Sequence, residues 1–278
     1  MESQHVDQLA ALAHPQRLAL FRLLVRRYPD ELSAGEIAAV LGVRQNTLST
    51  YLNSLRQAGL ILQKRDGRSL LYRAEMGQAG ALVSYLVTDC CRGRPELCPT
   101  LPDLGSGGTA MSSRPYNVLF ICTGNSARSI FGEALLSDLG GGRFNAYSAG
   151  TRPSSDLNLF ALSVLKANGH DISPLRAKNI DEFRSDAAPK MDFVFTVCDQ
   201  AANEDCPAWP GQPITAHWGL PDPGKATGTE AERRLAFRQA YGALRRRVEA
   251  FVSLNIEALD RLALQRAVDD LAAKKDLA

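Results

Sequence analysis

The sequence has no apolar run that approaches the length of a membrane-spanning helix, which excludes an integral membrane helix from the expected architecture. Residues 1–13 also lack the basic segment and following apolar block of a secretory signal, so a cytoplasmic location is expected. No internal repeat is present. With 278 residues, 45% of them hydrophobic, the chain is long enough for two compact domains that each bury a core.

Cysteine is scarce, with six residues in the whole chain. In a reducing cytosol, six thiols favour metal binding or catalysis over structural disulfides. An excess of either charge is also missing, since the formal net charge is +2. Positive charge is nevertheless in excess locally, because residues 44–73 contain six Lys and Arg residues and one acid, Asp66. Such a segment suits a phosphate backbone, although a solvated basic face explains the charge equally well.

A change of composition divides the chain. Residues 95–114 contain three prolines followed by Gly-Ser-Gly-Gly, which is typical of a linker. Residues 117–122 then form a continuous apolar run, which is typical of a buried parallel strand. The expected parts are a first domain at 1–98, a linker at 99–114, a second domain at 115–255 and a C-terminal helical tail at 256–278.

The first domain is predicted to be mainly helical, with one β-hairpin. Ser33 can cap a short helix that ends at Gly42, and a second helix follows at about 44–58. Two apolar runs then flank Asp66-Gly67, a dipeptide that favours a hairpin turn. Helix, tight turn, helix and hairpin is the order of a winged helix-turn-helix.

The helix over 44–58 has the composition of a recognition helix. Leu48, Leu52 and Leu55 form its apolar face, which leaves short polar side chains facing outward. Gln and Asn can pair with adenine edges, and the cations of the hairpin can hold phosphates. An ordinary amphipathic helix explains this segment taken alone, but the short helix, turn and basic hairpin around it favour DNA binding. The candidate DNA-binding residues are Gln45, Asn46, Thr47, Ser49, Thr50, Arg65 and Arg68.

Residues 5–98 resemble the ArsR-type family of arsenic-responsive winged-helix repressors. Three segments carry the likeness: Ala13-His-Pro-Gln-Arg, Leu55-Arg-Gln-Ala-Gly-Leu-Ile and Gly67-Arg-Ser-Leu-Leu-Tyr. The resemblance implies a homodimer that binds operator DNA and releases it when a thiophilic metalloid, As(III) or Sb(III), binds as effector.

The implied effector site needs thiols, and three lie near the end of this domain. Cys90 and Cys91 are adjacent, and the turn around Gly93 and Pro95 can bring Cys98 back to them. Three soft thiolates suit trigonal As(III) or Sb(III). Many members of the family carry their cysteines at the start of the recognition helix, where this sequence has none. A zinc site or incidental thiols are the alternatives, although zinc normally takes a fourth ligand and no His lies nearby in the sequence.

The second domain alternates strands and helices. This order predicts an α/β fold with a four-stranded parallel sheet flanked by helices. The tail is expected to add one more amphipathic helix. Strands are expected at 117–122, 144–148, 193–198 and 213–217, and helices at 127–139, 156–168 and 229–252.

Cys122 and Arg128 frame a loop between the first strand and the first helix of this domain. Their spacing lets the loop curl around a tetrahedral oxyanion, with N–H groups pointing inward and Arg128 closing the ring. The helix N-terminus and Arg128 are expected to favour the Cys122 thiolate. Gly124 is expected to permit the bend, and Asn125 and Ser129 to fix the loop and donate to the sulfur. The candidate oxyanion-binding residues are Thr123, Gly124, Asn125, Ser126, Ala127 and Ser129.

Catalysis at such a loop also needs an acid that protonates the leaving oxygen. Asp222 follows the last expected strand, in the segment Trp218-Gly-Leu-Pro-Asp-Pro. Loops at the carboxyl ends of parallel strands gather around one site, which makes Asp222 the candidate acid. A turn aspartate is the alternative, because Asp-Pro is common in turns.

From about 116 to 252 the chain resembles the low-molecular-weight tyrosine phosphatase superfamily. The likeness is carried by the Cys122 loop, the Ser148-Ala-Gly-Thr turn and the Asp222-Pro pair. Phosphatases of this superfamily usually place a second Cys just before the loop Arg and aromatic residues after Asp-Pro. Here Ala127 and Gly224-Lys occupy those places.

The arsenate-reductase branch instead carries a redox pair downstream, which Cys198 and Cys206 match. Cys206 is the informative residue, because a buried Cys at 198 also fits a phosphatase. The branch implies that Cys122 attacks arsenate while Asp222 assists loss of water, that Cys198 attacks Cys122 and arsenite leaves, and that Cys206 resolves the disulfide. Thioredoxin, or glutathione with glutaredoxin, then supplies electrons, and no tightly bound cofactor is implied. A phosphatase tethered to a repressor and a regulator with an inactive reductase domain are the alternatives.

Overall fold

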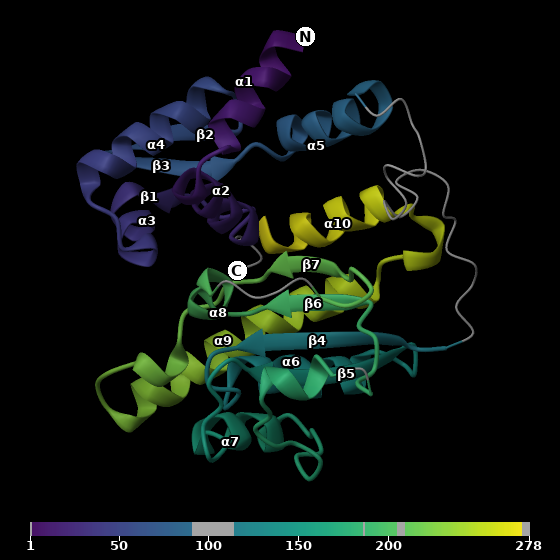
Figure 1. Ribbon diagram of the computed structural model, residues 1–278. Coiled ribbons are helices and arrows are strands. Elements are labelled where there is room, and N and C mark those ends of the chain that lie inside the picture. Colours follow the sequence, from purple (N-terminus) through teal and green to yellow (C-terminus); the bar gives the residue numbers. More distant parts are fainter. Residues whose placement is uncertain (1, 91–113, 186, 205–208, 274–278) are drawn as a thin grey trace. The chain divides into compact units, whose positions relative to one another are not determined.

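The computed structural model describes residues 2–90, 114–185, 187–204 and 209–273. The chain divides into two compact units, Met1–Leu104 and Gly105–Ala278, and each has its own buried apolar core (Figure 1). No helix in these ranges is long and apolar enough to cross a membrane.

The first unit has the predicted winged helix-turn-helix. The helices are accompanied by a three-stranded antiparallel sheet in the order β1-β3-β2. Strand β1 precedes α3, and β2 and β3 follow α4. Helix α1 and the two-residue strand β1 were not predicted. The elements are α1 (Glu2–Leu12), α2 (Pro15–Arg26), β1 (Leu32–Ser33), α3 (Ala34–Leu41), α4 (Gln45–Gln57), β2 (Ile61–Asp66), β3 (Ser69–Ala74), α5 (Met76–Tyr85) and the π-helical turn η1 (Leu86–Cys90).

Local chemistry explains the ends of α3 and the register of the wing. Ser33 and Glu36 form a reciprocal capping box at the start of α3, and Gly42 ends the helix in the left-handed region at φ 64°. Asp66 faces Ser69 across the turn of the β2–β3 hairpin. The left-handed Gly42 makes the tight turn that leads from α3 toward α4.

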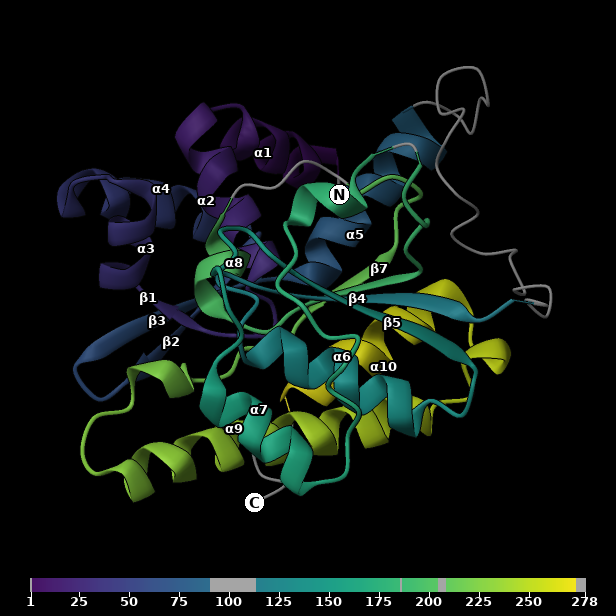
Figure 2. The same ribbon diagram turned by 90° about the horizontal axis from the view of Figure 1, so that it is seen from below.

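The second unit is the predicted α/β fold. All neighbouring strands are parallel, in the order β5-β4-β6-β7, and Figure 2 shows α6, α7 and α9 on one face of the sheet. Its strands are β4 (Tyr116–Cys122), β5 (Phe144–Gly150), β6 (Phe193–Thr196) and β7 (Ile214–His217). Its helices are α6 (Arg128–Leu139), α7 (Leu159–Ala167), α8 (Asp199–Asn203), α9 (Glu230–Val252) and α10 (Arg261–Ala273), with 3₁₀ turns at Ile180–Phe183, Pro223–Lys225 and Ile256–Ala258.

Capping residues account for most differences from the predicted boundaries. Helix α7 begins at Leu159 because the Asn158 side chain accepts hydrogen bonds from the first turn. Strand β6 ends at Thr196 because Cys198 already caps α8. Helix α8 is only five residues long, which is too short for a helical period to be visible in the sequence.

Helix α10 covers the outer strand of the sheet. The Gln265 side-chain amide donates to the Thr215 carbonyl of β7 at 2.8 Å, and the Trp218 indole donates to the Val268 carbonyl at 3.3 Å. Trp218 is fully buried and stacks on Phe195, with ring centroids 4.1 Å apart. A helix that satisfies the groups of an edge strand protects the sheet from pairing with another chain.

One carboxyl group of this helix, that of Asp269, is half-buried. Burial raises the pKa of Asp269 to about 6, with a smaller contribution from the charge of Asp270, while the hydrogen bond from Gln265 acts in the opposite direction. The folded state resists ionisation of Asp269. The stability contributed by the neutral carboxyl group is therefore fully present below pH 4 and is lost as the pH rises through about 6.

The variant Asp269→Asn is therefore expected to stabilise this unit at pH 8. The raised pKa of Asp269, discounted for its partial exposure, gives a gain on the order of 1 kcal/mol in the free energy of unfolding. The gain should vanish near pH 4. Denaturant unfolding followed by tryptophan fluorescence measures it, since both tryptophans lie in this unit. The exposed neighbour Asp270→Asn is the control; an equal gain from both variants, or an equal gain at both pH values, contradicts the assignment.

Candidate active site and nucleic-acid interface

The loop after β4 closes around the sulfur of Cys122. Strand β4 ends at Cys122 and helix α6 begins at Arg128, so the loop lies between a buried strand and a helix N-terminus. The backbone N–H of Asn125 donates to Cys122 Sγ at 3.2 Å, and Ser129 Oγ lies 2.9 Å from the same sulfur. Cys122 is only 3% exposed, and it therefore depends on these donors instead of water.

The bend of the loop is at Asn125 and not at Gly124, which was the residue expected to permit it. Asn125 has φ 44°, in the left-handed region that side chains other than Asn and Asp rarely adopt. Its Oδ1 accepts a 2.7 Å hydrogen bond from the backbone N–H of Lys178. Gly150 packs directly against the loop, where an added Cβ would lie 2.6 Å from the Thr123 carbonyl oxygen. Asn supplies both the backbone conformation and the bond that holds it.

A buried polar network extends behind the loop. The Asn125 side-chain amide donates to Ser129 Oγ and to Ser148 Oγ, both at 2.8 Å. Ser148 Oγ lies 2.5 Å from Glu133 Oε2, and Lys178 Nζ lies 2.9 and 2.8 Å from the two carboxylate oxygens of Glu133.

Glu133 and Lys178 were missed in the sequence. Glu133 follows Ser129 by four residues on α6, which places both on one helix face and is a signal that was available. Lys178 lies in an irregular segment 45 residues further along the chain, and no local pattern reveals its contact.

Arg128 and Asp222 lie together at the mouth of the loop. Arg128 Nη2 is 2.9 Å from Asp222 Oδ2, and Arg128 Nη1 donates to the Leu220 carbonyl at 3.0 Å. The Arg128 side chain is 11% exposed and that of Asp222 is 34% exposed. The guanidinium that was expected to hold an oxyanion thus pairs here with the candidate acid.

Two opposing influences act on the thiol of Cys122. Burial is the larger and raises the pKa of Cys122, and the nearby Cys198 adds to it, whereas the hydrogen bond from Ser129 and the charge of Arg128 lower the pKa. The net direction is upward, which differs from the expectation that Arg128 and the helix N-terminus favour the thiolate. The reason is the complete desolvation of the sulfur.

The second thiol, Cys198, lies beside the loop. It is 1% exposed, its Sγ is 3.4 Å from Thr123 Oγ1, and it caps α8 by accepting from the Ala201 N–H at 3.4 Å. Thr123 is thus the residue through which the loop of Cys122 contacts Cys198. Cys206 lies outside the described residues.

Both ends of α8 are held by ionisable pairs. Asp199 Oδ1 lies 3.2 Å from His217 Nε2 at the start of the helix. Arg152 Nη2 lies 2.7 Å from Glu204 Oε1 at its end, and the Arg152 backbone N–H donates to the Thr123 carbonyl of the loop. Helix α8 and Glu204 are therefore held beside the loop of Cys122 by contacts at both ends.

In the first unit, the polar face of α4 is free of the core. Leu48, Leu52 and Leu55 are buried, and every candidate DNA-binding residue is exposed: Gln45, Asn46, Thr47, Ser49, Thr50, Arg65 and Arg68. The hydroxyls of Ser49 and Thr50 donate to carbonyls one turn earlier in their own helix. No side chain caps the N-terminus of α4, so its first N–H groups are open to an anion.

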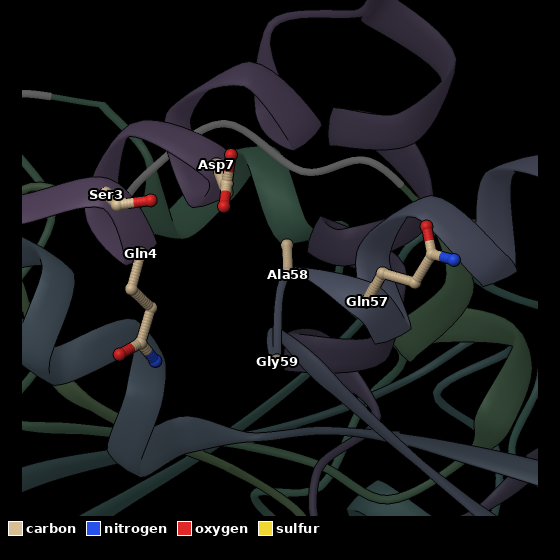
Figure 3. Close-up of a pocket in the computed structure, with 6 residues that line it drawn as sticks. All are labelled: Ser3, Gln4, Asp7, Gln57, Ala58 and Gly59. Atoms are coloured by element: carbon tan, nitrogen blue, oxygen red, sulfur yellow. The ribbon is translucent and has the colours of Figure 1, made fainter. Parts of the chain in front are cut away.

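The remaining features of this unit are a thiol and a hollow. Cys90 is exposed at the end of η1, whereas Cys91 and Cys98 lie outside the described residues. A hollow of about 400 Å³ lies between α1 and the end of α4. Figure 3 shows the residues that line it, Ser3, Gln4, Asp7, Gln57, Ala58 and Gly59. Its lining offers no thiol to a metalloid and none of the polar residues of the recognition face.

Profiles of known protein families match both parts of the chain. The profile of the low molecular weight phosphotyrosine protein phosphatases matches residues 117–265, which is more than half of the chain. The chain belongs to the low molecular weight phosphotyrosine protein phosphatase family. A helix-turn-helix domain profile matches residues 12–63, so a member of this phosphatase family is joined here to a helix-turn-helix domain.

The relatives of the phosphatase-family domain include arsenate reductases. Those of Halalkalibacterium halodurans and Bacillus subtilis are each 36% identical over 134 residues, which cover 48% of this chain and 93% of each relative. A solved arsenate reductase in the phosphate binding state is 28% identical, with a TM-score of 0.42, and the match covers 50% of this chain and 97% of that one.

Proposed function

We propose that the phosphatase-family domain reduces arsenate to arsenite and that the helix-turn-helix domain is a repressor that responds to the product. The observation that carries the enzymatic part is the contact of Thr123 with Cys198, which brings a second buried thiol to the loop of the nucleophile. It supports reduction together with Cys206, the third thiol that follows in the sequence. Phosphate ester hydrolysis needs no second thiol, whereas reduction of arsenic needs two electrons from a pair of thiols.

Binding of the oxyanion is the first step. Arsenate resembles phosphate in shape and charge, so the loop N–H groups and the guanidinium of Arg128 suit both. Arg128 must exchange its contact with Asp222 for the oxyanion, a change that frees the Asp222 carboxyl group for proton transfer. The pair therefore couples substrate binding to release of the acid.

The chemical steps balance as three thiol reactions. Cys122 thiolate forms a bond to arsenic, and a water molecule leaves with a proton from Asp222. Cys198 thiolate then attacks Cys122 Sγ; the sulfur–arsenic bond breaks and its electron pair stays with arsenic, which leaves as arsenite. Cys206 thiolate attacks Cys198 Sγ and releases Cys122. An external dithiol, thioredoxin or glutathione with glutaredoxin, reduces the resulting disulfide, and no tightly bound cofactor takes part.

The resolving step requires α8 to open. Cys206 follows this five-residue helix, whose ends are held by the His217–Asp199 and Arg152–Glu204 pairs. The Arg152 side chain is 66% exposed, so that pair is weak, and a helix this short is unstable without its contacts. Movement of Cys198 toward Cys122 removes the cap and favours unwinding.

The variant Cys206→Ser tests the relay. It should complete about one turnover and then accumulate a Cys122–Cys198 disulfide, because the resolving thiolate is missing. Arsenite release and non-reducing peptide mapping measure the two outcomes, with Cys122→Ser as the inactive control. Sustained turnover with glutathione and glutaredoxin identifies the glutathione route. Unchanged hydrolysis of a phosphate ester, with no arsenate-dependent disulfide in any variant, favours the phosphatase alternative.

The first unit supports an operator-binding dimer. Val6 and Leu9 of α1, and Val83 of α5, are exposed apolar side chains, and a second copy of the chain would bury them. Two recognition helices in such a dimer suit a palindromic operator. Cys90, Cys91 and Cys98 are the proposed ligands of arsenite or antimonite, because a trigonal soft ion matches three thiolates.

Neutralising the wing tests the placement of the DNA. The double variant Arg65→Ala/Arg68→Ala should weaken binding to operator and random DNA alike and reduce the salt slope by about two, as expected for two phosphate contacts. Gln45→Ala should instead change sequence preference, by roughly 1–3 kcal/mol at one base pair. Fluorescence anisotropy against salt measures both. Lys64→Ala, at the third cation of the hairpin, is the comparison and should lose less, because Lys64 pairs with Glu31. Equal losses for the double variant and Lys64→Ala contradict the placement.

A further inference from the structure

The acid loop, residues 218–222, loses a partner when an oxyanion binds. Arg128 contacts this loop twice, at the Asp222 carboxylate at 2.9 Å and at the Leu220 carbonyl at 3.0 Å. A guanidinium that turns to the oxyanion gives up both contacts. The Asp222 carboxyl group is therefore needed at the site at the moment when Arg128 no longer holds its loop.

A second arginine, Arg247 of α9, holds the start of the acid loop. Its Nη1 donates to the Trp218 carbonyl at 2.9 Å and to the Gly219 carbonyl at 3.3 Å. Buried loop carbonyls need a donor, and a charged donor forms a stronger bond than a neutral one. Gly219 is also confined by the ring of His217, because an added Cβ would lie 2.6 Å from the ring Nε2. The first two residues of the loop are therefore fixed by contacts that do not involve Arg128.

Helix α10 supports the same end of the loop through the indole of Trp218. The indole N–H donates to the Val268 carbonyl at 3.3 Å, and both residues are fully buried. The helix lies along β7 (Figure 1) and is anchored in the domain core by three more buried side chains, Leu264, Leu271 and Ala272. A buried indole N–H has no water to bond, so this contact fixes the orientation of the ring from which the acid loop starts.

We propose that Arg247 is a positioning residue that holds the acid loop in place while Arg128 binds the oxyanion. The contact of Trp218 with α10 acts in the same way on the same end of the loop. Arg128 holds the opposite end, so its departure leaves the start of the loop fixed and keeps the Asp222 carboxyl group at the mouth of the site. The proposal rests on the proposed function in taking Asp222 as the acid.

Hydrogen exchange with inorganic phosphate as the probe tests the holding role without any reduction of arsenate. The full chain is saturated with phosphate, which draws Arg128 to the anion, and exchange of the peptide that contains the acid loop is followed by mass spectrometry. Phosphate should change this exchange less than about twofold in the wild-type protein. In Arg247→Met it should speed the exchange about tenfold, because neither arginine then holds the loop.

Two further variants separate the holding role from a general loss of stability. Arg246→Met removes the neighbouring exposed arginine of α9 and should behave as the wild type. Trp218→Phe keeps an aromatic ring in the core and removes the donor to Val268, so phosphate should also speed exchange of the loop in this variant. Peptides of β4 and α6 should exchange at the wild-type rate in all three variants, because the contacts removed belong to the acid loop.

A double-mutant cycle connects the loop to the acid. Arg247→Met should lower the rate of arsenite formation in a single turnover roughly tenfold, with the half-saturating arsenate concentration unchanged, because a misplaced acid slows the chemical step and leaves oxyanion binding intact. In the Asp222→Asn background Arg247→Met should lower the rate no further, since the acid that it positions is already missing.

An equal loss of rate in both backgrounds overturns the proposal, and so does exchange of the acid loop in Arg247→Met that phosphate leaves unchanged. Opening of the loop by phosphate in Arg247→Met, in a protein that forms no arsenite, leaves the proposal standing and rejects the reductase instead.

Discussion

Burial of the Cys122 sulfur is the constraint around which the catalytic domain is arranged. Removing the thiol from water opposes the thiolate that the first proposed step needs, and burial is the largest influence on its pKa. Two fixed donors in the loop, the Asn125 N–H and Ser129 Oγ, stabilise the sulfur. Contacts from β5, α6 and the segment at Lys178 hold these donors in place. The left-handed backbone of Asn125 and the close approach of Gly150 follow from the same requirement.

The parts of this account that are visible in the sequence are those with a local pattern. A buried strand, the Cys122 to Arg128 spacing and an Asp-Pro segment predict the loop and the sheet. The capping residue Ser33 and the turn at Gly42 predict the helix-turn-helix. Helices α1 and α8 escaped prediction because they are short or weakly amphipathic. The Lys178–Glu133 pair escaped because its members are 45 residues apart and meet only once the sheet has formed.

The two domains have complementary chemistry under the proposed function. Arsenate is a hard oxyanion that fits a loop of N–H groups, whereas arsenite is thiophilic and fits a cluster of thiolates such as Cys90, Cys91 and Cys98. Arsenate therefore has to be reduced to arsenite before the thiolates can bind it. Because both domains belong to one chain, arsenite would form close to the thiolates proposed to bind it.

The most direct test of this coupling is release of the full chain from operator DNA by arsenate. With a thiol-reducing system present, arsenate should release the wild-type protein, and without that system it should not. Cys122→Ser should ignore arsenate under the same conditions and still be released by arsenite, while the Cys90, Cys91 and Cys98 triple Ser variant should reduce arsenate and stay on DNA. Release of Cys122→Ser by arsenate as readily as wild type would contradict the account.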